Sequence, residues 1–355
     1  MTATGTLLLE DGSRFPGTWF GADVGVAGEV VFNTGMVGYP ETLTDPSYTG
    51  QILVCTYPLI GNYGVPSVEW DADGLLRTFE ATSIRIRGLV VATLAADTSH
   101  WSASQSLHEW MAASGIPGLA GIDTRALTKR LRERGVMLGK LVREEEDVPW
   151  HDPNLRNLVA EASPSTVTRH GRDGPRVILV DMGAKEGIAR SLVAAGARVI
   201  RVPWDHDFFD EDFDGVCLSN GPGDPKMTER AVEHTRRALA EGIPMLGVCL
   251  GNQVMALAAG ADTYKLKYGH RSQNQPCVEV GTHRCHITSQ NHGYAVDATT
   301  LPPGWREWFR NANDGSNEGI RHESLPARAV QFHPEASPGP TDTASLFADF
   351  VRSLR

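Results

Sequence analysis

From residue 176 onward, the chain alternates apolar runs with amphipathic stretches of about 10 to 15 residues. RVILVDMG and ARVIRVPW are almost continuous runs of Val, Ile and Leu, which is typical of strands that are buried on both faces. KEGIARSLVAAG and TERAVEHTRRALAEG have the length and periodicity of helices. Strands that alternate with helices form a parallel sheet with helices on both faces. We therefore predict an open, mostly parallel α/β sheet over residues 176–355.

The first 145 residues follow a different pattern, in which strand-like runs dominate. Asp11-Gly12 stands between TLLLE and SRFPGTWF, and this dipeptide is typical of a two-residue hairpin turn. A helix is predicted from Asp123, as its N-cap, to Arg134, with Gly135 just past its end. These features predict a mixed, strand-rich α+β domain over residues 1–145.

The stretch 146–175 has the periodicity of neither a helix nor a strand. Pro, Asp and Gly collect there, as in VPWHDPNLRN and HGRDGP, and such residues favour turns over regular elements. We interpret this stretch as a connector between the two domains, with one short helix around residues 155–162.

Charge and hydropathy exclude two classes of partner. The chain has 33 Lys and Arg against 43 Asp and Glu, a net charge of -10, so its field repels nucleic acid and anionic membrane surfaces. The apolar stretch 243–261 is interrupted by Gly247, Gly251 and Gly260 and is too short in each piece to cross a membrane. The N-terminus lacks the basic start and apolar run of a signal peptide. We expect a cytoplasmic protein that binds neither nucleic acid nor membrane.

The five cysteines indicate neither a disulfide framework nor a structural zinc site. Their number is odd and no Cys-x-x-Cys pair occurs. No metal site is therefore predicted. For the cysteines other than Cys249, the favoured interpretation is a buried, inert thiol; these are Cys55, Cys217, Cys277 and Cys285.

One strand-to-helix junction has the composition of a nucleophile turn. Gly247-Val248-Cys249-Leu250-Gly251 joins the apolar run IPMLGV to the helical stretch LGNQVMALAAG. Flanking glycines permit the tight turn that presents a nucleophile above the edge of a sheet, here with cysteine in place of serine. The following N–H points at a developing oxyanion, and a helix N-terminus favours the thiolate. Cys249 is the candidate nucleophile, with a structural cysteine in a tight turn as the alternative.

A cysteine nucleophile needs a base and a group that orients the base. The run Ala329–Phe332 is strand-like and ends at His333, which Pro334-Glu335 follows. A carboxylate two residues away can hold the imidazole and stabilise its charged form. His333 is therefore the candidate base and Glu335 the candidate orienting group. The alternative is a His-Pro-Glu turn on the surface without a function.

The loop SNGPGDP, residues 219–225, follows another predicted strand. Ligands of open α/β sheets bind at the carboxyl ends of strands, and the N–H groups of Gly221 and Gly223 can bind an oxyanion or a carboxylate. A phosphate-binding loop is disfavoured because no Gly-Lys-Ser/Thr follows. An ordinary turn remains the alternative.

Taken together, the GVCLGNQ turn, the SNGPGDP loop and the HPE sequence resemble the triad-type glutamine amidotransferases. Further motifs make the chain similar to the small subunit of glutamine-dependent carbamoyl phosphate synthetase. They are GEVVFNTGMVGYPETLTDPSYTGQI, YPLIGNYGV, GIDTRALTKRLRERG, TSQNHGYAVD and QFHPEASPGP. The resemblance runs from about residue 5 to the C-terminus, and the N-terminal motifs make it specific, since sibling amidotransferases lack that domain.

The resemblance implies a role for each matching residue. Cys249 would be the nucleophile, His333 the general base and Glu335 its orienting carboxylate, and the N–H groups of Gly221 and Leu250 would form the oxyanion hole. Contacts to L-glutamine would fall on Ser47, Gly221, Gly223, Leu250, Gln253, Asn291, Gly293 and Tyr294. Ser47 belongs to the N-terminal domain, which implies a pocket at the domain interface. On its own, Asn291-His292-Gly293 is also typical of a hairpin turn.

The reaction implied by the resemblance is hydrolysis of L-glutamine. The ammonia would pass to a separate large subunit, in a heterodimer or a higher oligomer. That subunit would make carbamoyl phosphate from bicarbonate and ATP for arginine and pyrimidine biosynthesis. We expect no cofactor on this chain, because the sequence has no Walker-type loop; ATP and Mg²⁺ would be used by the partner.

The sequence also departs from the family pattern. Asn252 stands where many relatives have His, Tyr294 where Phe is usual, and Ser272-Gln273 where a Gly pair is common. None of these removes a member of the triad. Two alternatives remain open. An amidotransferase subunit for anthranilate, GMP or CTP synthesis would lack the first 145 residues, and a non-catalytic regulatory homologue would be expected to lose Cys249 or His333.

Overall fold

The computed structural model describes residues 3–143 and 146–355. The chain forms two compact units, the first being Met1–Trp70 with Leu76–Leu155 and the second Asp71–Leu75 with Arg156–Arg355. The division falls inside the stretch 146–175, while the domain boundary predicted at residue 145 lies outside the described residues. Each unit has a sheet and a hydrophobic core of its own.

The first unit is built around a closed barrel with the strand order β1-β2-β8-β6-β4-β3-β9. The Asp11-Gly12 hairpin is confirmed, since β1 and β2 flank it and pair antiparallel. The barrel closes because β1 also pairs with β9, with Leu7 opposite Leu141. The strands of this unit are β1 (Thr4–Leu9), β2 (Arg14–Gly21), β3 (Val26–Asn33), β4 (Gln51–Cys55), β5 (Leu59–Ile60), β6 (Gly88–Val90), β7 (Thr93–Leu94), β8 (Pro117–Ala120) and β9 (Met137–Arg143).

The helices of the first unit are short, and α3 is capped as the sequence predicts. Asp123 accepts a hydrogen bond from the N–H of Ala126 at 2.9 Å, and Gly135, at a φ of 105°, ends the helix. The helices are α1 (Tyr39–Thr44), α2 (Leu107–Ala113) and α3 (Thr124–Arg134), with the 3-10 turns η1 (Pro46–Tyr48) and η2 (Pro153–Leu155). The mixed, strand-rich domain is thereby confirmed.

The second unit contains one sheet with the order β10-β12-β11-β13-β14-β19-β18-β17-β15-β16. The predicted parallel sheet is confirmed in its central part, where β12, β11, β13, β14 and β19 run parallel. Beyond β19 the sheet continues with antiparallel strands. The strands are β10 (Thr168–His170), β11 (Arg176–Asp181), β12 (Arg198–Pro203), β13 (Gly215–Leu218), β14 (Met245–Val248), β15 (Asp262–Glu279), β16 (Cys285–Asp297), β17 (Trp305–Asn311), β18 (Asn317–His322) and β19 (Ala327–Val330).

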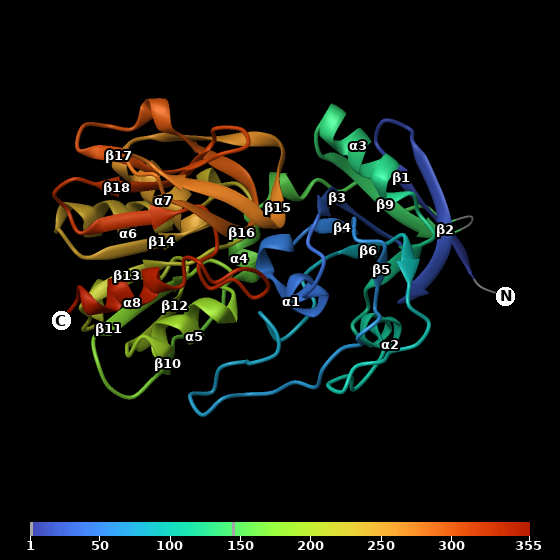
Figure 1. Ribbon diagram of the computed structural model, residues 1–355, viewed down its shortest axis with the longest axis horizontal. Helices are drawn as coiled ribbons and strands as arrows, with labels where there is room; N and C mark the ends of the chain where they lie inside the picture. Colours follow the sequence, from blue (N-terminus) through green and yellow to red (C-terminus); the bar gives the residue numbers. More distant parts are fainter. Residues whose placement is uncertain (1–2, 144–145) are drawn as a thin grey trace. The chain divides into compact units, whose positions relative to one another are not determined.

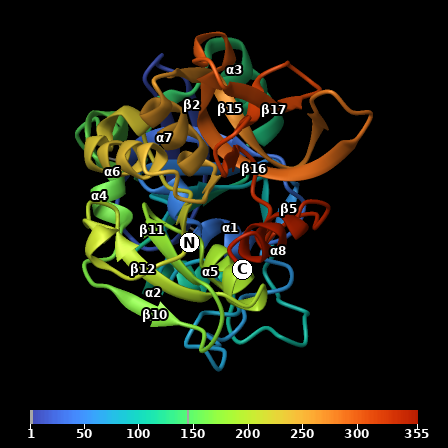
Figure 2. The ribbon, with the colours of Figure 1, turned by 90° about the vertical axis from the view of Figure 1, so that its left-hand side faces the viewer.

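Helices cover both faces of the parallel strands, which can be followed in Figures 1 and 2. Alternate residues of β11 enter different cores: Val177 packs with residues of α5 and α8, and Ile178 with residues of α6 and α7. This alternation is the reason for the almost continuous apolar strand sequences. The helices are α4 (Leu158–Ala162), α5 (Glu186–Ala194), α6 (Glu229–Ala240), α7 (Leu250–Ala259) and α8 (Ser345–Arg352), with the 3-10 turns η3 (Phe208–Asp210), η4 (Pro225–Met227) and η5 (Ala298–Thr300).

The apolar stretch 243–261 contains strand β14 and helix α7, as the sequence predicts. In the part of the chain that the structure describes, no helix combines the length and the apolar character needed to cross a membrane.

Candidate active site

The junction of β14 and α7 holds Cys249 in a strained turn. Its φ is 55° and its ψ is -102°, a conformation that side-chain-bearing residues rarely adopt. A Cβ on Gly247 would lie 2.6 Å from the carbonyl oxygen of Gly251, and a Cβ on Gly251 would lie 2.4 Å from that of Leu218. The turn therefore needs glycine on both sides of Cys249, in agreement with the nucleophile turn expected from the sequence.

Backbone strain of this kind is concentrated in two segments. Among the described residues, the non-glycine positions with left-handed φ are Cys249, Ala336 (54°) and Ser337 (50°). Ala336 directly follows Glu335, so the second strained segment adjoins the proposed orienting carboxylate. Such strain costs of order 1–3 kcal/mol per residue and is retained mainly at functional sites.

His333 is buried next to Glu335. The residue lies three positions past the end of β19, where its backbone N–H donates to the carbonyl oxygen of Ser289 on β16 at 2.9 Å. Its Nδ1 lies 2.5 Å from Oε1 of Glu335. The two side chains are 2% and 0% exposed. A surface His-Pro-Glu turn is therefore excluded.

A buried lysine completes this group and contacts the same carboxylate oxygen as the imidazole. Nζ of Lys185 lies 3.2 Å from Oε1 of Glu335 and also donates to the carbonyl oxygen of Ala336. The backbone N–H of Lys185 donates to Oδ1 of Asn220 at 2.8 Å, in the SNGPGDP loop. Lys185 thus links the proposed orienting carboxylate to the loop that follows β13.

These neighbours set the protonation of the pair. Burial would raise the pKa of Glu335, but the charges of Lys185 and His333 outweigh it and lower that pKa to about 2. Burial would lower the pKa of His333, but Glu335 and the neighbouring Cys249 sulfur, by charge and hydrogen bonding, raise it to about 10. Glu335 is therefore ionised at neutral pH, and His333 carries a proton beside Cys249.

The sulfur of Cys249 is enclosed by polar groups. It lies 3.7 Å from the carbonyl oxygen of Asn291 and 3.7 Å from Nε2 of Gln331, which donates to it. Gln331 is fully buried, and Cys249 itself is 2% exposed, so the sulfur is shielded from solvent. We call Cys249, His333, Glu335 and Lys185 the thiol cluster.

The SNGPGDP loop lies against the same turn. Oγ of Ser219 accepts a hydrogen bond from the N–H of Met182 at 2.9 Å. A Cβ added to Gly221 would lie 2.2 Å from the Met182 carbonyl oxygen and 2.8 Å from Cδ2 of Leu250. The two predicted oxyanion-hole residues are therefore neighbours, and Leu250, as the first residue of α7, has an N–H without an acceptor in its own helix. Gly223, with a φ of 84°, is in the same loop.

Three predicted glutamine contacts lie inside strand β16 and not in a turn; they are Asn291, Gly293 and Tyr294. The hairpin-turn interpretation of Asn291-His292-Gly293 is therefore wrong. The pairing with β15 changes register between residues 265 and 270, so β15 bulges opposite Gly293. A glycine inside a strand commonly marks such a bulge. On the neighbouring helix α7, Gln253 donates through Nε2 to the Tyr294 carbonyl oxygen at 2.9 Å, which joins the predicted contacts on the helix and the strand.

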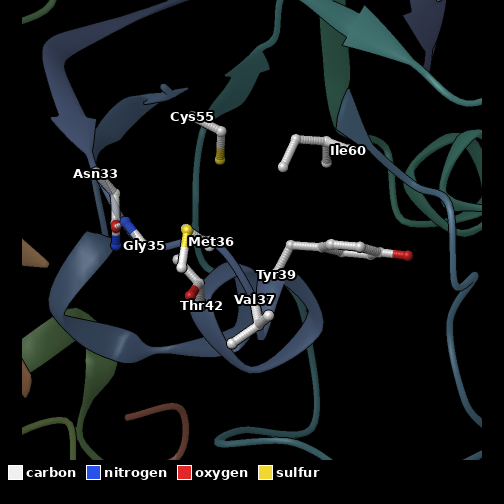
Figure 3. Close-up of a pocket in the computed structure, with 8 residues that line it drawn as sticks. All are labelled: Asn33, Gly35, Met36, Val37, Tyr39, Thr42, Cys55 and Ile60. Carbon is white, nitrogen blue, oxygen red and sulfur yellow. Dashed lines mark hydrogen bonds between the residues drawn. The ribbon is translucent and has the colours of Figure 1, made fainter. Parts of the chain in front are cut away.

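Ser47 lies in the first unit, in turn η1, where its N–H donates to Oδ1 of Asp45 at 2.9 Å. Its contact with glutamine stays a prediction. The same unit contains a pocket, shown in Figure 3, that is lined by residues of β3, α1, β4 and β5 and of the segment between β3 and α1. They are Asn33, Gly35, Met36, Val37, Tyr39, Thr42, Cys55 and Ile60. Burial raises the pKa of Cys55 to about 12, so this pocket has no reactive thiol.

The inert-thiol interpretation is confirmed for three cysteines and wrong for one. Cys55, Cys217 and Cys277 are buried, and burial raises the pKa of each. Cys285 is exposed, because it begins β16 beside the turn that links this strand to β15.

Sequence reasoning missed two residues of the site. Lys185 precedes helix α5 and reaches residues about 150 positions away, so no local motif indicates it. The sequence indicates Gln331 only as part of a strand, whereas in the structure its side chain accepts hydrogen bonds from Asn252 (3.3 Å) and Gln253 (3.1 Å) and donates to Cys249. An amide in an otherwise apolar strand was the available signal for Gln331.

Two protein-family models match the chain. The carbamoyl-phosphate synthase small chain, CPSase domain, matches residues 7–141, and the class-I glutamine amidotransferase matches residues 178–353. The second match contains Cys249, His333 and Glu335. The first covers the part that an amidotransferase subunit of another pathway was expected to lack.

Curated relatives agree with these matches. The chain is 50% identical over 386 residues to the multifunctional protein pyr-3 of Neurospora crassa, covering 98% of this chain and 21% of that protein. It is 51% identical over 356 residues to the multifunctional protein CAD of Squalus acanthias, covering 99% and 16%. The arginine-specific small chain of carbamoyl phosphate synthase from Aspergillus fumigatus is 49% identical over 360 residues, covering 99% and 80%. The chain therefore spans about a fifth or less of the multifunctional relatives.

Proposed function

Because the chain belongs to the family of carbamoyl phosphate synthase small chains, we propose that it hydrolyses L-glutamine and supplies ammonia for the synthesis of carbamoyl phosphate. The observation that carries this proposal is the thiol cluster, in which a strained, buried cysteine lies beside a His–Glu pair. The product would serve arginine and pyrimidine biosynthesis, the pathways suggested by the resemblance.

In the proposed reaction, the Cys249 thiolate attacks the side-chain amide carbon of glutamine. The C–N bond then breaks, and the imidazolium of His333 gives its proton to the departing ammonia, which leaves a glutamyl thioester on Cys249. Neutral His333 next takes a proton from water, and the resulting hydroxide attacks the thioester. Glutamate leaves, and the thiolate and the imidazolium are restored.

Glu335 and Lys185 act through His333. The carboxylate accepts a hydrogen bond from Nδ1 of His333 at 2.5 Å. This bond fixes the ring, so that Nε2 is the nitrogen that exchanges protons at the Cys249 sulfur and the substrate. Lys185 keeps that carboxylate ionised. Proton transfer by a positioned group is worth about 10²–10⁴-fold in rate, so we assign Glu335 and Lys185 positioning roles.

Backbone groups stabilise the oxyanion that forms on the amide oxygen. The N–H groups of Gly221 and Leu250 are the proposed donors, and an interaction of this kind is worth about 10²–10³-fold in rate. Glutamine would be held by Ser47, Gly221, Gly223, Leu250, Gln253, Asn291, Gly293 and Tyr294.

The ammonia would pass through an internal tunnel to a separate large subunit. That partner would combine it with bicarbonate and ATP, with Mg²⁺, in a heterodimer or a higher oligomer. This chain would bind no nucleotide of its own.

The test is reconstitution with a partner. The purified chain is mixed with carbamoyl phosphate synthetase large subunits, and glutamate release and carbamoyl phosphate formation from glutamine are measured. We expect both products in the mixture, whereas the large subunit alone makes carbamoyl phosphate only from ammonium. Glutamine hydrolysis without coupled carbamoyl phosphate formation, together with activation by an anthranilate, GMP or CTP synthase subunit, would overturn the assignment.

A further inference from the structure

A second group of titratable side chains lies in the antiparallel part of the sheet in the second unit. His270 is on β15, His292 lies opposite it on β16, and Glu318 is on β18. One nitrogen of each imidazole and one oxygen of the carboxylate all lie within 4.8 Å of one another, and all three residues are buried. We call these three residues the imidazole cluster; none of them has a part in the proposed hydrolysis.

The separations are close to those of a metal site. Nδ1 of His270 lies 3.3 Å from Oε1 of Glu318, and Nε2 of His292 lies 4.0 Å from the same oxygen. Ligand atoms at the zinc bond lengths of about 2.0–2.1 Å are roughly 3.3 Å apart in a tetrahedral site. Of the three separations between ligand atoms, the first already has this length and the second exceeds it by less than about 1 Å, and the two imidazole nitrogens lie within 4.8 Å of each other.

The outer nitrogen of each imidazole is held by an oxygen. Nε2 of His270 lies 2.8 Å from Oδ2 of Asp314, and Nδ1 of His292 lies 2.8 Å from the carbonyl oxygen of Tyr294. Each of these oxygens can accept a hydrogen bond from the outer nitrogen; on the inner side, Nε2 of His292 also lies 3.2 Å from Oε1 of Gln290. Metal-binding histidines are characteristically fixed in this way, by a carboxylate or a carbonyl group behind the ring.

The centre of the cluster has polar atoms without hydrogen-bond partners. Within the described residues, neither Nδ1 of His270 nor Oε2 of Glu318 has one, although Nδ1 is at ion-pair distance from the other carboxylate oxygen. Oε1 of Glu318 accepts from Nδ2 of Asn311 at 3.0 Å. Buried polar atoms are almost always satisfied, and a cation at the centre would satisfy both.

We propose that His270, His292 and Glu318 bind a divalent transition-metal ion of the zinc class. Imidazole nitrogens with a carboxylate suit Zn²⁺ better than Mg²⁺ or Ca²⁺, which prefer oxygen ligands. The ion ties together β15, β16 and β18. It thereby stabilises the strand that contains Asn291, whose carbonyl oxygen lies 3.7 Å from the Cys249 sulfur. The inference is independent of the glutaminase proposal.

The test measures metal binding directly, in a protein that lacks the proposed nucleophile and the exposed thiol. Cys249→Ala with Cys285→Ser removes the thiol at the candidate active site and the exposed thiol. This protein is freed of metal by a chelator and titrated with Zn²⁺ and with Co²⁺. We expect one equivalent to bind with a Kd below about 1 μM, a higher melting temperature with the ion than without it, and the visible absorption of low-coordinate Co²⁺ without a thiolate band.

Substitutions distinguish metal binding at the imidazole cluster from metal binding at surface side chains. His270→Asn and Glu318→Gln should each weaken Zn²⁺ binding by more than about 100-fold, and Asp314→Asn, behind the ring, by about 10–100-fold. The matched control is His283→Asn, at an exposed position in the turn between β15 and β16, which should leave the Kd unchanged.

Two results would overturn the proposal. One is a parent protein that binds neither ion with a Kd below about 100 μM, in which case a protonated His270 alone balances the carboxylates. The other is binding that persists unchanged in His270→Asn and Glu318→Gln. If these variants do not fold, the Co²⁺ spectrum of the parent protein decides, because an octahedral, water-like spectrum contradicts the site.

Discussion

Two buried glutamates in the second unit have different surroundings. Glu335 meets one imidazole, His333 at 2.5 Å, and one ammonium, Lys185 at 3.2 Å. Glu318 meets two imidazoles, His270 at 3.3 Å and His292 at 4.0 Å, and no lysine or arginine ion pair of Glu318 is found among the described residues. Both carboxylates are fully buried.

The difference shows what a buried carboxylate needs in order to orient a base. Burial raises the pKa of both glutamates, but Lys185 and His333 together reverse the effect at Glu335 and lower its pKa, whereas the pKa of Glu318 stays raised. An ammonium remains charged over the whole physiological pH range, so it keeps Glu335 ionised and able to orient His333. In the imidazole cluster the carboxylate faces His270 instead, and although burial would lower the pKa of His270, Asp314 and Glu318 raise it to about 9. Unlike an ammonium, an imidazole can give up its proton to a metal ion that takes its place.

The sharpest test of the thiol cluster removes its sulfur. We expect Cys249→Ala to lower glutamine-dependent carbamoyl phosphate synthesis by at least about a thousand-fold, while synthesis from high ammonium stays near the wild-type rate, because the ATP-using steps belong to the partner. Both rates are measured on the complex with each nitrogen source.

A melting curve of the same variant excludes a structural explanation. Alanine keeps the Cβ and the strained φ of Cys249, and the lost sulfur leaves only a small cavity, so the free energy of unfolding should fall by about 1 kcal/mol. A structural cysteine would instead make both nitrogen sources fail together. In a regulatory homologue, the substitution would change the rate of carbamoyl phosphate synthesis with neither nitrogen source.

The two imidazoles give the next comparison. His333→Asn should lower kcat for glutamine hydrolysis by about 100-fold or more, because it removes the proton donor. His270→Asn removes an imidazole of the other cluster and should cost less than about 10-fold. Glu335→Gln should fall between the two, since the carboxylate only orients the ring. Losses at His270 as large as those at His333 would mean that the clusters share one function.

A substitution at Lys185 tests whether its ammonium group is what distinguishes Glu335 from Glu318. Lys185→Met leaves Glu335 buried with one partner fewer, and breaking a buried pair in this way costs about 3–5 kcal/mol in the free energy of unfolding. The control is Lys226→Met, because Lys226 and its partner Asp262 are 51% and 58% exposed and such a pair is worth at most about 1 kcal/mol.

A positioning role for Lys185 has a second signature. Without the ammonium, the pKa of Glu335 should rise, so the acid limb of the kcat/KM profile for glutamine should move to higher pH. An unchanged profile, with stability lost equally in Lys185→Met and Lys226→Met, would show that the ammonium is not what distinguishes Glu335.

The two halves of the sheet also differ in how well the sequence predicted them. The parallel strands and their helices have strong periodicity and were predicted with nearly correct bounds, and so was the turn at Cys249. Strands β15 and β16 contain Lys, His, Arg, Gln and Asn, so local propensity gives only short strand-like runs, whereas the pairing of the two strands makes them 18 and 13 residues long. Closure of the barrel likewise depends on a long-range register, Leu7 opposite Leu141.

The candidate site shows the same limit. Cys249, His333 and Glu335 lie in compact motifs, and the sequence indicated them. Lys185 was not predicted, because its contact with the HPE segment spans about 150 residues. His270, His292 and Glu318 are more than twenty positions apart in sequence, outside any metal-binding motif, and only the pairing of β15 with β16 and the position of β18 bring them together.

The smallest expected effect is the pH dependence of stability carried by Glu335 and His333. The pKa of Glu335 falls from 4.5 to about 2 on folding, so its contribution is complete above pH 4.5 and is lost as the pH falls through about 2. The pKa of His333 rises from 6.5 to about 10, so its contribution is complete below pH 6.5 and is lost as the pH rises through about 10.

Both contributions are therefore complete between pH 4.5 and 6.5. The difference in melting temperature between wild type and Glu335→Gln should have a plateau in this window, with a height of a few degrees, at roughly 2–4 °C for each kcal/mol. It should decline on both sides. Glu233→Gln is the matched control, because Glu233 and its partner Arg230 are 54% and 68% exposed, and its difference should stay near zero at every pH. A difference that stays constant with pH for Glu335→Gln as well would mean that the pKa values of the buried pair do not change on folding. Glu335 would then resemble a surface carboxylate in spite of its burial.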